Sequence, residues 1–244
     1  MSDAAPKWLP YSVRATLFHS GASLPDSEHL LSRFESELES STKTGKVEHA
    51  AIGSLGAGKL SITQKPMRLD VVWETPIESD MTMLGETGEV LEHLLTPLKS
   101  LIVENNWIRV AIGVHAGERV ANHVAGYKEM DHLFPDLALN GETTSDFSFQ
   151  INRFTQVSLP SGGIRLNRLA RWGVKKVSFA VLLMDSTGPV SQQDEEEIYV
   201  AGVELDINSA VSPGRELAGD EALLIMERAC SEACTIIERG DHGR

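Results

Sequence analysis

The chain has 244 residues, 41% of them hydrophobic and 23% charged, and a formal charge of −13 at pH 7. This length suits one large domain or two small ones, and the composition is typical of a globular protein. The acidity argues against a protein whose whole surface holds nucleic acid, and no apolar run approaches the roughly 18 residues that cross a bilayer. The first ten residues lack an apolar core, so no signal peptide is expected.

The first half predicts a strand, a helix, three strands and a long helix. Residues 11–18 alternate between apolar and polar side chains, as a half-buried strand does. A helix opens after Pro25, and its apolar stripe runs from Leu30 to Leu38. Short strands are then expected at residues 46–53, 59–64 and 67–75, followed by a helix over residues 83–105. Pro97 should kink that helix or restart it.

The second half predicts a similar order of elements. A strand is expected at residues 107–115 and a helix at residues 118–134. The later elements are strands at residues 144–158, 163–172, 174–184 and 198–207, and a last helix at about 219–240. That helix carries both cysteines, Cys230 and Cys234, on one face, where parallel side chains are poorly placed for a disulfide. We interpret them as small buried thiols, which fits a cytoplasmic location.

Each half therefore follows a β-α-βββ(β)-α pattern. Because strands outnumber helices and follow one another directly, we expect an α+β fold in which long helices pack on one face of antiparallel sheets. The boundaries would be residues 1–106 for the N-terminal half and 107–244 for the C-terminal half, unless the two form one continuous domain. No repeat can be aligned residue by residue, so the similarity of the halves rests on the pattern alone.

One stretch stands out by its charge. Residues 147–184 contain no Asp or Glu, although the chain holds 35 acidic residues. The stretch carries six basic residues, namely Arg153, Arg165, Arg168, Arg171, Lys175 and Lys176. A positive segment in so acidic a chain is the best place to look for a partner.

A hairpin is expected in this stretch, with Ser161 and Gly162 as a two-residue loop and paired residue numbers that sum to 323. Strand alternation then gives the hairpin a polar face and a mostly apolar face. The polar face holds Gln150, Asn152, Asn167, Arg165 and Arg171. The apolar face holds Arg153 and Arg168.

These two faces suggest two different roles. A buried guanidinium is costly unless it is paired, so we interpret Arg153 and Arg168 as structural charge pairs with an acidic helix, for example through Glu216, Asp220 or Glu221. The five polar-face residues could form an anion-recognising surface. Its partner would be an acidic segment of another protein, or a nucleic-acid strand along the face from Asn152 to Lys176.

Other motifs carry less chemistry. Residues 53–59 resemble a phosphate-binding loop, but Leu60 stands where Ser or Thr is needed, and the segment lies between strands, so we expect a hairpin loop. His115 and Arg119 could line a pocket near a strand end, together with Asn152. No metal, cofactor or catalytic constellation is predicted, because no spacing matches a known one.

Four short segments can be compared with a known family. They are residues 60–73, 108–113, 147–153 and 199–207, the last followed by a long terminal helix. Together they resemble a sporadically distributed family of bacterial proteins with no assigned function. Where such proteins tend to have a Tyr-Ile-Asn-Arg-like run, this chain has Val114 to Arg119. The resemblance implies bacterial origin, an intracellular location and two related halves, and it supplies no catalytic residues.

Three functional hypotheses remain open from the sequence. The first is a non-catalytic bacterial binding protein, an accessory subunit of an assembly such as a defence or toxin-linked module, that uses the basic sheet face. The second is a small-ligand sensor or enzyme with a pocket between the halves. The third is an acidic antitoxin, immunity protein or chaperone whose negative helices cover a basic partner.

Overall fold

The structure is a computed structural model of the chain. It describes residues 8–21, 24–44, 48–76, 82–137, 139, 147–179, 182–185, 188–192, 196–210 and 214–239. Of the predicted elements, residues 46, 47, 144–146, 180, 181 and 240 lie outside this part of the chain.

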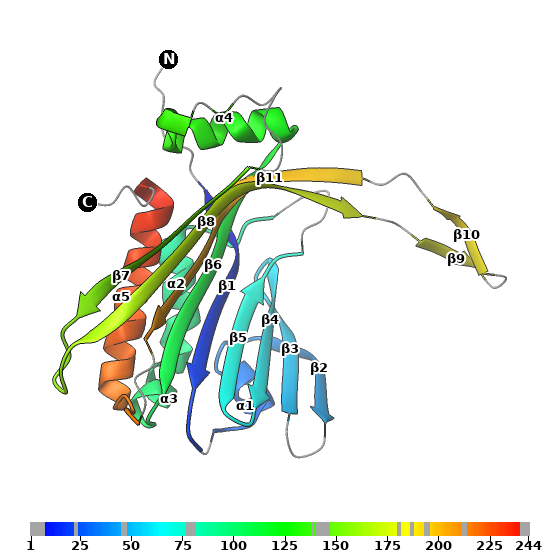
Figure 1. Cartoon of the computed structure of the whole chain (residues 1–244). Coiled ribbons are helices and arrows are strands. Elements are labelled where there is room, and N and C mark those ends of the chain that lie inside the picture. Colours follow the sequence, from blue (N-terminus) through cyan, green and yellow to red (C-terminus); the bar gives the residue numbers. More distant parts are fainter. Residues whose placement is uncertain are drawn as a thin grey trace.

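The fold is α+β and is built on one nine-stranded antiparallel sheet (Figure 1). Its strand order is β2-β3-β4-β5-β1-β6-β11-β8-β7. The strands are β1 (Leu9–Phe18), β2 (Glu37–Thr44), β3 (Glu48–Leu55), β4 (Gly58–Lys65), β5 (Arg68–Glu74), β6 (Arg109–Val120), β7 (Ser148–Val157), β8 (Ile164–Phe179) and β11 (Glu196–Ser209). A separate two-stranded sheet pairs β9 (Leu182–Asp185) with β10 (Gly188–Gln192).

Four helices pack against the large sheet, and they lie on one of its faces. They are α1 (Ser27–Ser32), α2 (Thr87–Leu95), α4 (His123–Leu133) and α5 (Gly219–Arg239). Helix α2 continues through the 3-10 turn η1 (Thr96–Leu98) into α3 (Lys99–Val103), which packs against α5. Pro97 lies in η1, so the long helix is irregular at this proline, where the sequence predicted a kink or a restart. A 3-10 turn, η2 (Pro135–Leu137), follows α4.

The hydrophobic core lies between the helices and this face, which we call the helix face. One cross-strand row runs from Val13 through Val114 and Leu205 to Ala170, and all four side chains are buried. Such a row places apolar side chains from both halves of the chain against the same helices. Burial of these side chains is the main favourable term in holding the sheet to the helix layer.

The predicted helix after Pro25 is wrong beyond its first turns. Helix α1 ends at Ser32, Glu35 adopts a left-handed backbone with φ of 56°, and the chain then enters strand β2. Leu38, expected in the apolar stripe of the helix, is 50% exposed on that edge strand. Strand β2 is rich in Ser and Thr, and its pairing with β3 outweighs the helical spacing of a few leucines.

Two predictions about the basic hairpin are corrected. Residues 163–172 and 174–184 were expected as two strands, but β8 runs unbroken through Gly173. The loop between β7 and β8 spans six residues, because Val157 pairs with Ile164. Paired numbers therefore sum to 321 and not to 323. A shift of two residues leaves every side chain on its predicted face, because the side-chain period of a strand is two.

The two predicted halves meet in the middle of the sheet, where β1 pairs with β6 along most of its length. In the first half β5 pairs with β1, and in the second β11 pairs with β6. Within the described segments, no helix combines the length and the apolar character needed to span a membrane.

Candidate binding face

The face of the sheet opposite the helices is polar, and we call it the open face. Its side chains come from alternate residues of each strand, so cross-strand pairing arranges them in rows. One row holds Ser12, His115, Glu204, Arg171 and Gln150, and the next but one holds Thr16, Ala111, Asn208, Asn167 and Phe154. An antiparallel sheet covered on one side only commonly presents such a face to water.

The structure places every predicted binding residue on the open face. Gln150 and Asn152 lie on the edge strand β7, while Arg165, Asn167 and Arg171 lie on the adjacent strand β8. The amide of Asn167 donates a hydrogen bond to the side-chain oxygen of Asn208 at 3.3 Å. The five residues therefore share one surface, which spans the outer strands of the C-terminal half.

Arg153 and Arg168 lie on the helix face, opposite each other in the β7–β8 pair. The guanidinium of Arg168 donates a 2.6 Å hydrogen bond to Glu232 of α5, and Arg228 contacts the other oxygen of that carboxylate. Glu232 was not among the three acidic residues suggested from the sequence. Of those, Glu221 accepts a hydrogen bond from the backbone N–H of Ser161 at 2.8 Å.

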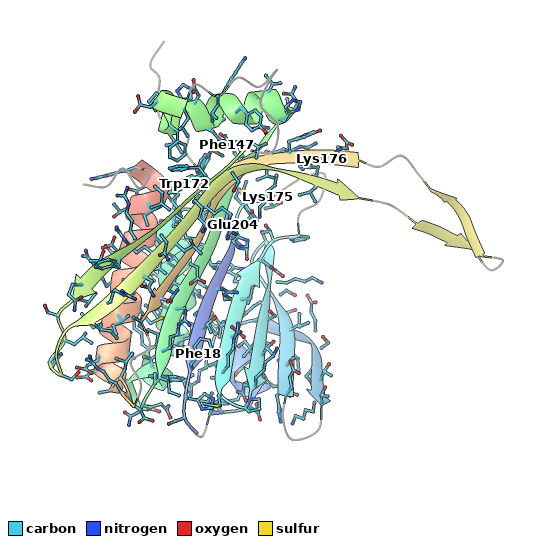
Figure 2. The ribbon with its side chains drawn as sticks, viewed as in Figure 1. Phe18, Phe147, Trp172, Lys175, Lys176 and Glu204 are labelled. Atoms are coloured by element: carbon cyan, nitrogen blue, oxygen red, sulfur yellow. The ribbon has the colours of Figure 1, made fainter. Side chains whose placement is uncertain are left out.

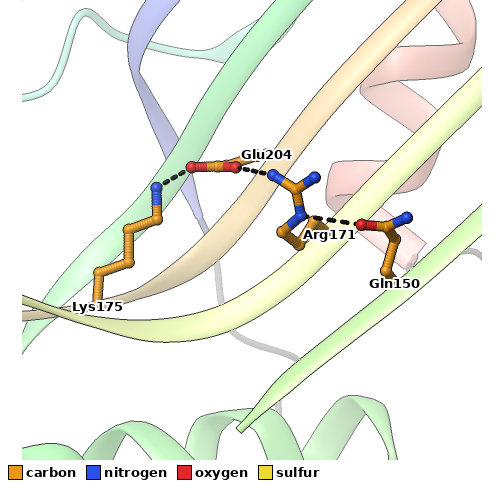
Figure 3. Close-up of polar contacts among 4 residues, drawn as sticks. All are labelled: Gln150, Arg171, Lys175 and Glu204. Carbon is orange, nitrogen blue, oxygen red and sulfur yellow. Dashed lines mark hydrogen bonds and ion pairs between the residues drawn. The ribbon is translucent and has the colours of Figure 1, made fainter. Parts of the chain in front are cut away.

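Arg171 belongs to a chain of polar contacts (Figure 3). It donates to a Glu204 oxygen at 2.8 Å and, through Nε, to the Gln150 side-chain oxygen at 3.1 Å. Lys175 donates to the other oxygen of Glu204. Glu204 is mostly buried, whereas the two cationic side chains are about half exposed. The carboxylate therefore orients both cations.

Arg165 has a different environment from Arg171. Its guanidinium lies over the ring of Phe154, 5.4 Å from the ring centre, and Phe154 is 64% exposed. A guanidinium over a ring face is attracted by the ring without using its N–H groups, which stay available to an acceptor. Within the described residues, no carboxylate contacts Arg165.

A second arginine–phenylalanine group lies at the same end of the open face as Arg165 and Phe154. The sequence analysis did not predict it. Arg68 and Arg109 both lie over the ring of Phe18, at 5.4 and 5.6 Å from its centre. Arg68 also pairs with Asp70 at 2.6 Å. Figure 2 shows Phe18 at the far end of the sheet from Glu204 and Lys175. The three residues stand on β1, β5 and β6, so only the strand order brings them together.

The backbone brings the two arginine–phenylalanine groups into register. Strand β6 pairs with β11, and β11 with β8, so Arg109 and Arg165 stand in one row. Between them stands Ala210, whose backbone N–H bonds to the carbonyl of Arg165 at 2.8 Å. Two strand spacings separate the two backbones, or about 10 Å. We call Phe18, Arg68, Arg109, Phe154 and Arg165 the arginine band.

His115 and Arg119, predicted to line a pocket, also lie on the open face of β6. His115 packs against Tyr11 with ring centres 5.9 Å apart. Burial, reinforced by the positive charges of Lys175 and Arg14, lowers the pKa of His115 to about 4. Asn152 stands on β7, three strands away from β6, so it does not share a pocket with His115.

The remaining motifs have plain structural positions. The glycine-rich segment forms the turn of the β3–β4 hairpin, with Gly56 at φ of 55°, as the sequence predicted. Cys230 and Cys234 are free thiols, and burial raises the pKa of both, that of Cys230 to about 12. In the part of the chain that the structure describes, no three His, Cys, Asp or Glu side chains gather as metal ligands.

Comparison with known proteins does not assign the chain to a family. No protein-family model and no curated protein matches the chain.

Proposed function

We propose that the chain is a non-catalytic intracellular binding protein, an accessory subunit of a larger assembly, that holds an acidic segment of another protein on its open face. The observation that carries the proposal is the arginine band. Arg109 and Arg165 stand in one row, each guanidinium lies over a phenylalanine ring, and neither has a carboxylate partner within the described residues. The intracellular setting rests on the sequence resemblance and on the free thiols.

The electrostatic contrast supports this proposal. The chain carries a net charge of −13 and contains 35 Asp and Glu residues. In so acidic a chain, a guanidinium without a carboxylate partner is unusual. Most other described cations of the outer strands have such partners, as Arg171 and Lys175 have in Glu204. Guanidinium groups are the side chains best suited to bidentate contact with carboxylates. Two of them in one row, with backbones about 10 Å apart, would suit two acidic side chains of one extended segment.

An acidic peptide suits the band better than a nucleic-acid strand. Sequence-independent binding of a single strand uses several aromatic rings on which successive bases stack. Here Arg68 and Arg109 already lie over Phe18, which leaves Phe154 as the strongly exposed aromatic ring of the described residues.

The test uses two labelled probes, a ten-residue poly-glutamate peptide and a ten-nucleotide oligo-dT. Fluorescence anisotropy would be measured with the wild type and with the double variant Arg109→Glu/Arg165→Glu. We expect the peptide to bind the wild type and the variant to bind it at least tenfold more weakly, because the loss of two charge-assisted contacts is worth about 3 kcal/mol. Binding should weaken between about 50 and 200 mM salt, since exposed charges are screened.

A matched control makes the same charge change elsewhere. Lys43 on β2 and Lys128 on α4 are both exposed and lie away from the open face, so Lys43→Glu/Lys128→Glu should bind the peptide nearly as the wild type does. Equal peptide binding by the two double variants would contradict the proposal. Tighter binding of oligo-dT than of the peptide, lost in Arg109→Glu/Arg165→Glu, would identify nucleic acid as the occupant instead.

A further inference from the structure

Three glycines form one cross-strand row on the open face. Gly202 of β11 pairs with Gly117 of β6 on one side and with Gly173 of β8 on the other. A Cβ atom on Gly117 would lie 2.5 Å from the carbonyl oxygen of Ala201, so side chains are excluded there by the approach of the two backbones. At this level β8 and β11 curve away from the rest of the sheet (Figure 1). Glycines in strand interiors commonly mark such bends or a close approach of another group.

The bare row opens a hollow of about 230 Å³ in the open face. Gly173 and Gly202 line it, so exposed peptide planes form part of its surface. Tyr11 and Val200 give it an apolar wall, and these two side chains belong to a small hydrophobic cluster separate from the main core. The hollow is smaller than the roughly 300 to 1,000 Å³ of sites for drug-sized ligands, which limits an occupant to about one ring.

The opposite wall is charged. Arg171, Lys175 and Glu204 all line the hollow, two cations around one carboxylate, as Figure 3 shows. Burial and then the charge of Arg171 lower the pKa of Lys175, and burial together with Lys175 and Arg14 lowers that of nearby His115. Burial is the larger cause of both shifts, and the neighbouring cations reinforce it, so the charged wall holds two cations around the single carboxylate of Glu204.

We propose that this hollow binds a small, flat acid, a single ring that carries a carboxylate or phosphate group. The ring would lie on the peptide planes of Gly173 and Gly202 against Tyr11 and Val200. Its acid group would accept hydrogen bonds from Lys175 and Arg171, which Glu204 already holds in place. This site lies at the other end of the open face from Phe18 of the arginine band and does not depend on the proposed peptide binding (Figure 2).

Calorimetric titration of the full chain with benzoate, phenyl phosphate and inorganic phosphate tests the proposal. We expect a ring acid to bind the wild type and inorganic phosphate to bind much more weakly, because phosphate alone leaves the apolar wall unused. Comparison of benzoate with phenyl phosphate identifies the acid group. Lys175→Gln should weaken binding about tenfold through the loss of one charge-assisted hydrogen bond.

Two further variants make the result specific. Lys176→Gln removes the same charge from the adjacent residue, which points to the helix face, and should leave the affinity unchanged. Ser148 is exposed, pairs with Gly173 and lines the hollow, so Ser148→Tyr should fill it and abolish binding without loss of thermal stability. Arg109→Glu/Arg165→Glu should bind the ring acid normally, which separates this site from the proposed peptide site. No heat with either ring acid, or equal affinities for Lys175→Gln and Lys176→Gln, would overturn the proposal.

Discussion

At the scale of single residues, the face of the strand decides what an arginine does. Arg165 and Arg168 stand three residues apart on β8 and therefore project to opposite faces. Arg168 is enclosed by helix α5 and contacts Glu232, a carboxylate that is only 7% exposed. Arg165 is exposed and lies over the ring of Phe154. The same side chain thus contributes to stability at one position and remains available to a partner at the other.

This difference predicts unequal costs of truncation. Arg168→Ala removes a 2.6 Å contact to the buried carboxylate of Glu232 and leaves the half-exposed Arg228 beside it, so we expect a loss of about 3 kcal/mol in the free energy of unfolding. Arg165→Ala should cost less than about 1 kcal/mol, because its cation–π contact is exposed to water. Urea denaturation followed by circular dichroism measures both values. Similar losses for the two variants would show that the face assignment does not govern their roles.

At the scale of elements, the glycine row explains how long strands can bend without a break. A Cβ atom on Gly202 would collide with the carbonyl oxygen of Ala116 and lie 2.9 Å from the Cα atom of Gly117. We therefore expect Gly202→Ala to destabilise the protein by about 3 kcal/mol, the upper end for overpacked sites. Gly88 in α2 is the matched control, since its nearest atom would be the Cys234 sulfur at 4.0 Å. Gly88→Ala should stabilise the fold by about 0.5 kcal/mol.

Thermal unfolding of both variants measures whether each substitution raises or lowers the stability. An unchanged stability of Gly202→Ala would contradict the close approach of the two backbones.

Local pattern predicted many elements, and its failures have physical causes. The polar and apolar faces of β7 and β8 were assigned correctly from alternation although the loop was misread, because the register error was an even number of residues. The helix expected to reach Leu38 was wrong because pairing of β2 with β3 competes with helical spacing. The sequence also could not place Gly173 at a bend, since a glycine between two apolar runs looks equally like a turn.

The candidate site was only half predictable. Gln150, Asn152, Asn167, Arg165 and Arg171 lie within 22 residues of sequence, so one hairpin was enough to group them. Phe18 and Arg109 stand 91 positions apart, and their contact depends on the pairing of β1 with β6. No local pattern contains that pairing. Only a weak signal could have pointed to them: each residue occupies a position on the polar face of its strand, Phe18 in β1 and Arg109 in β6.

At the scale of the whole molecule, one sheet and one core connect the two halves that the sequence analysis separated at residue 106. The main core cluster is continuous and contains side chains from both sides of that boundary, such as Val71 and Leu91 before it and Ile112 and Met226 after it. Helix α5 packs on β6 and β11 and also contacts α2 and α3 of the first half. A core shared in this way favours unfolding as one cooperative unit.

The four tryptophans can report on this cooperativity without any substitution. Trp8 and Trp73 lie before residue 106, Trp107 and Trp172 after it, and all four are buried. With 5-fluorotryptophan incorporated, each should give its own ¹⁹F signal, and we expect all four native signals to disappear at one urea midpoint. That midpoint should coincide with the midpoint from far-ultraviolet circular dichroism, since one transition exposes the whole core. Loss of the Trp8 and Trp73 signals at a different urea concentration from the other pair would instead show two separately folding units, and the β1–β6 pairing would then be a docking contact between them.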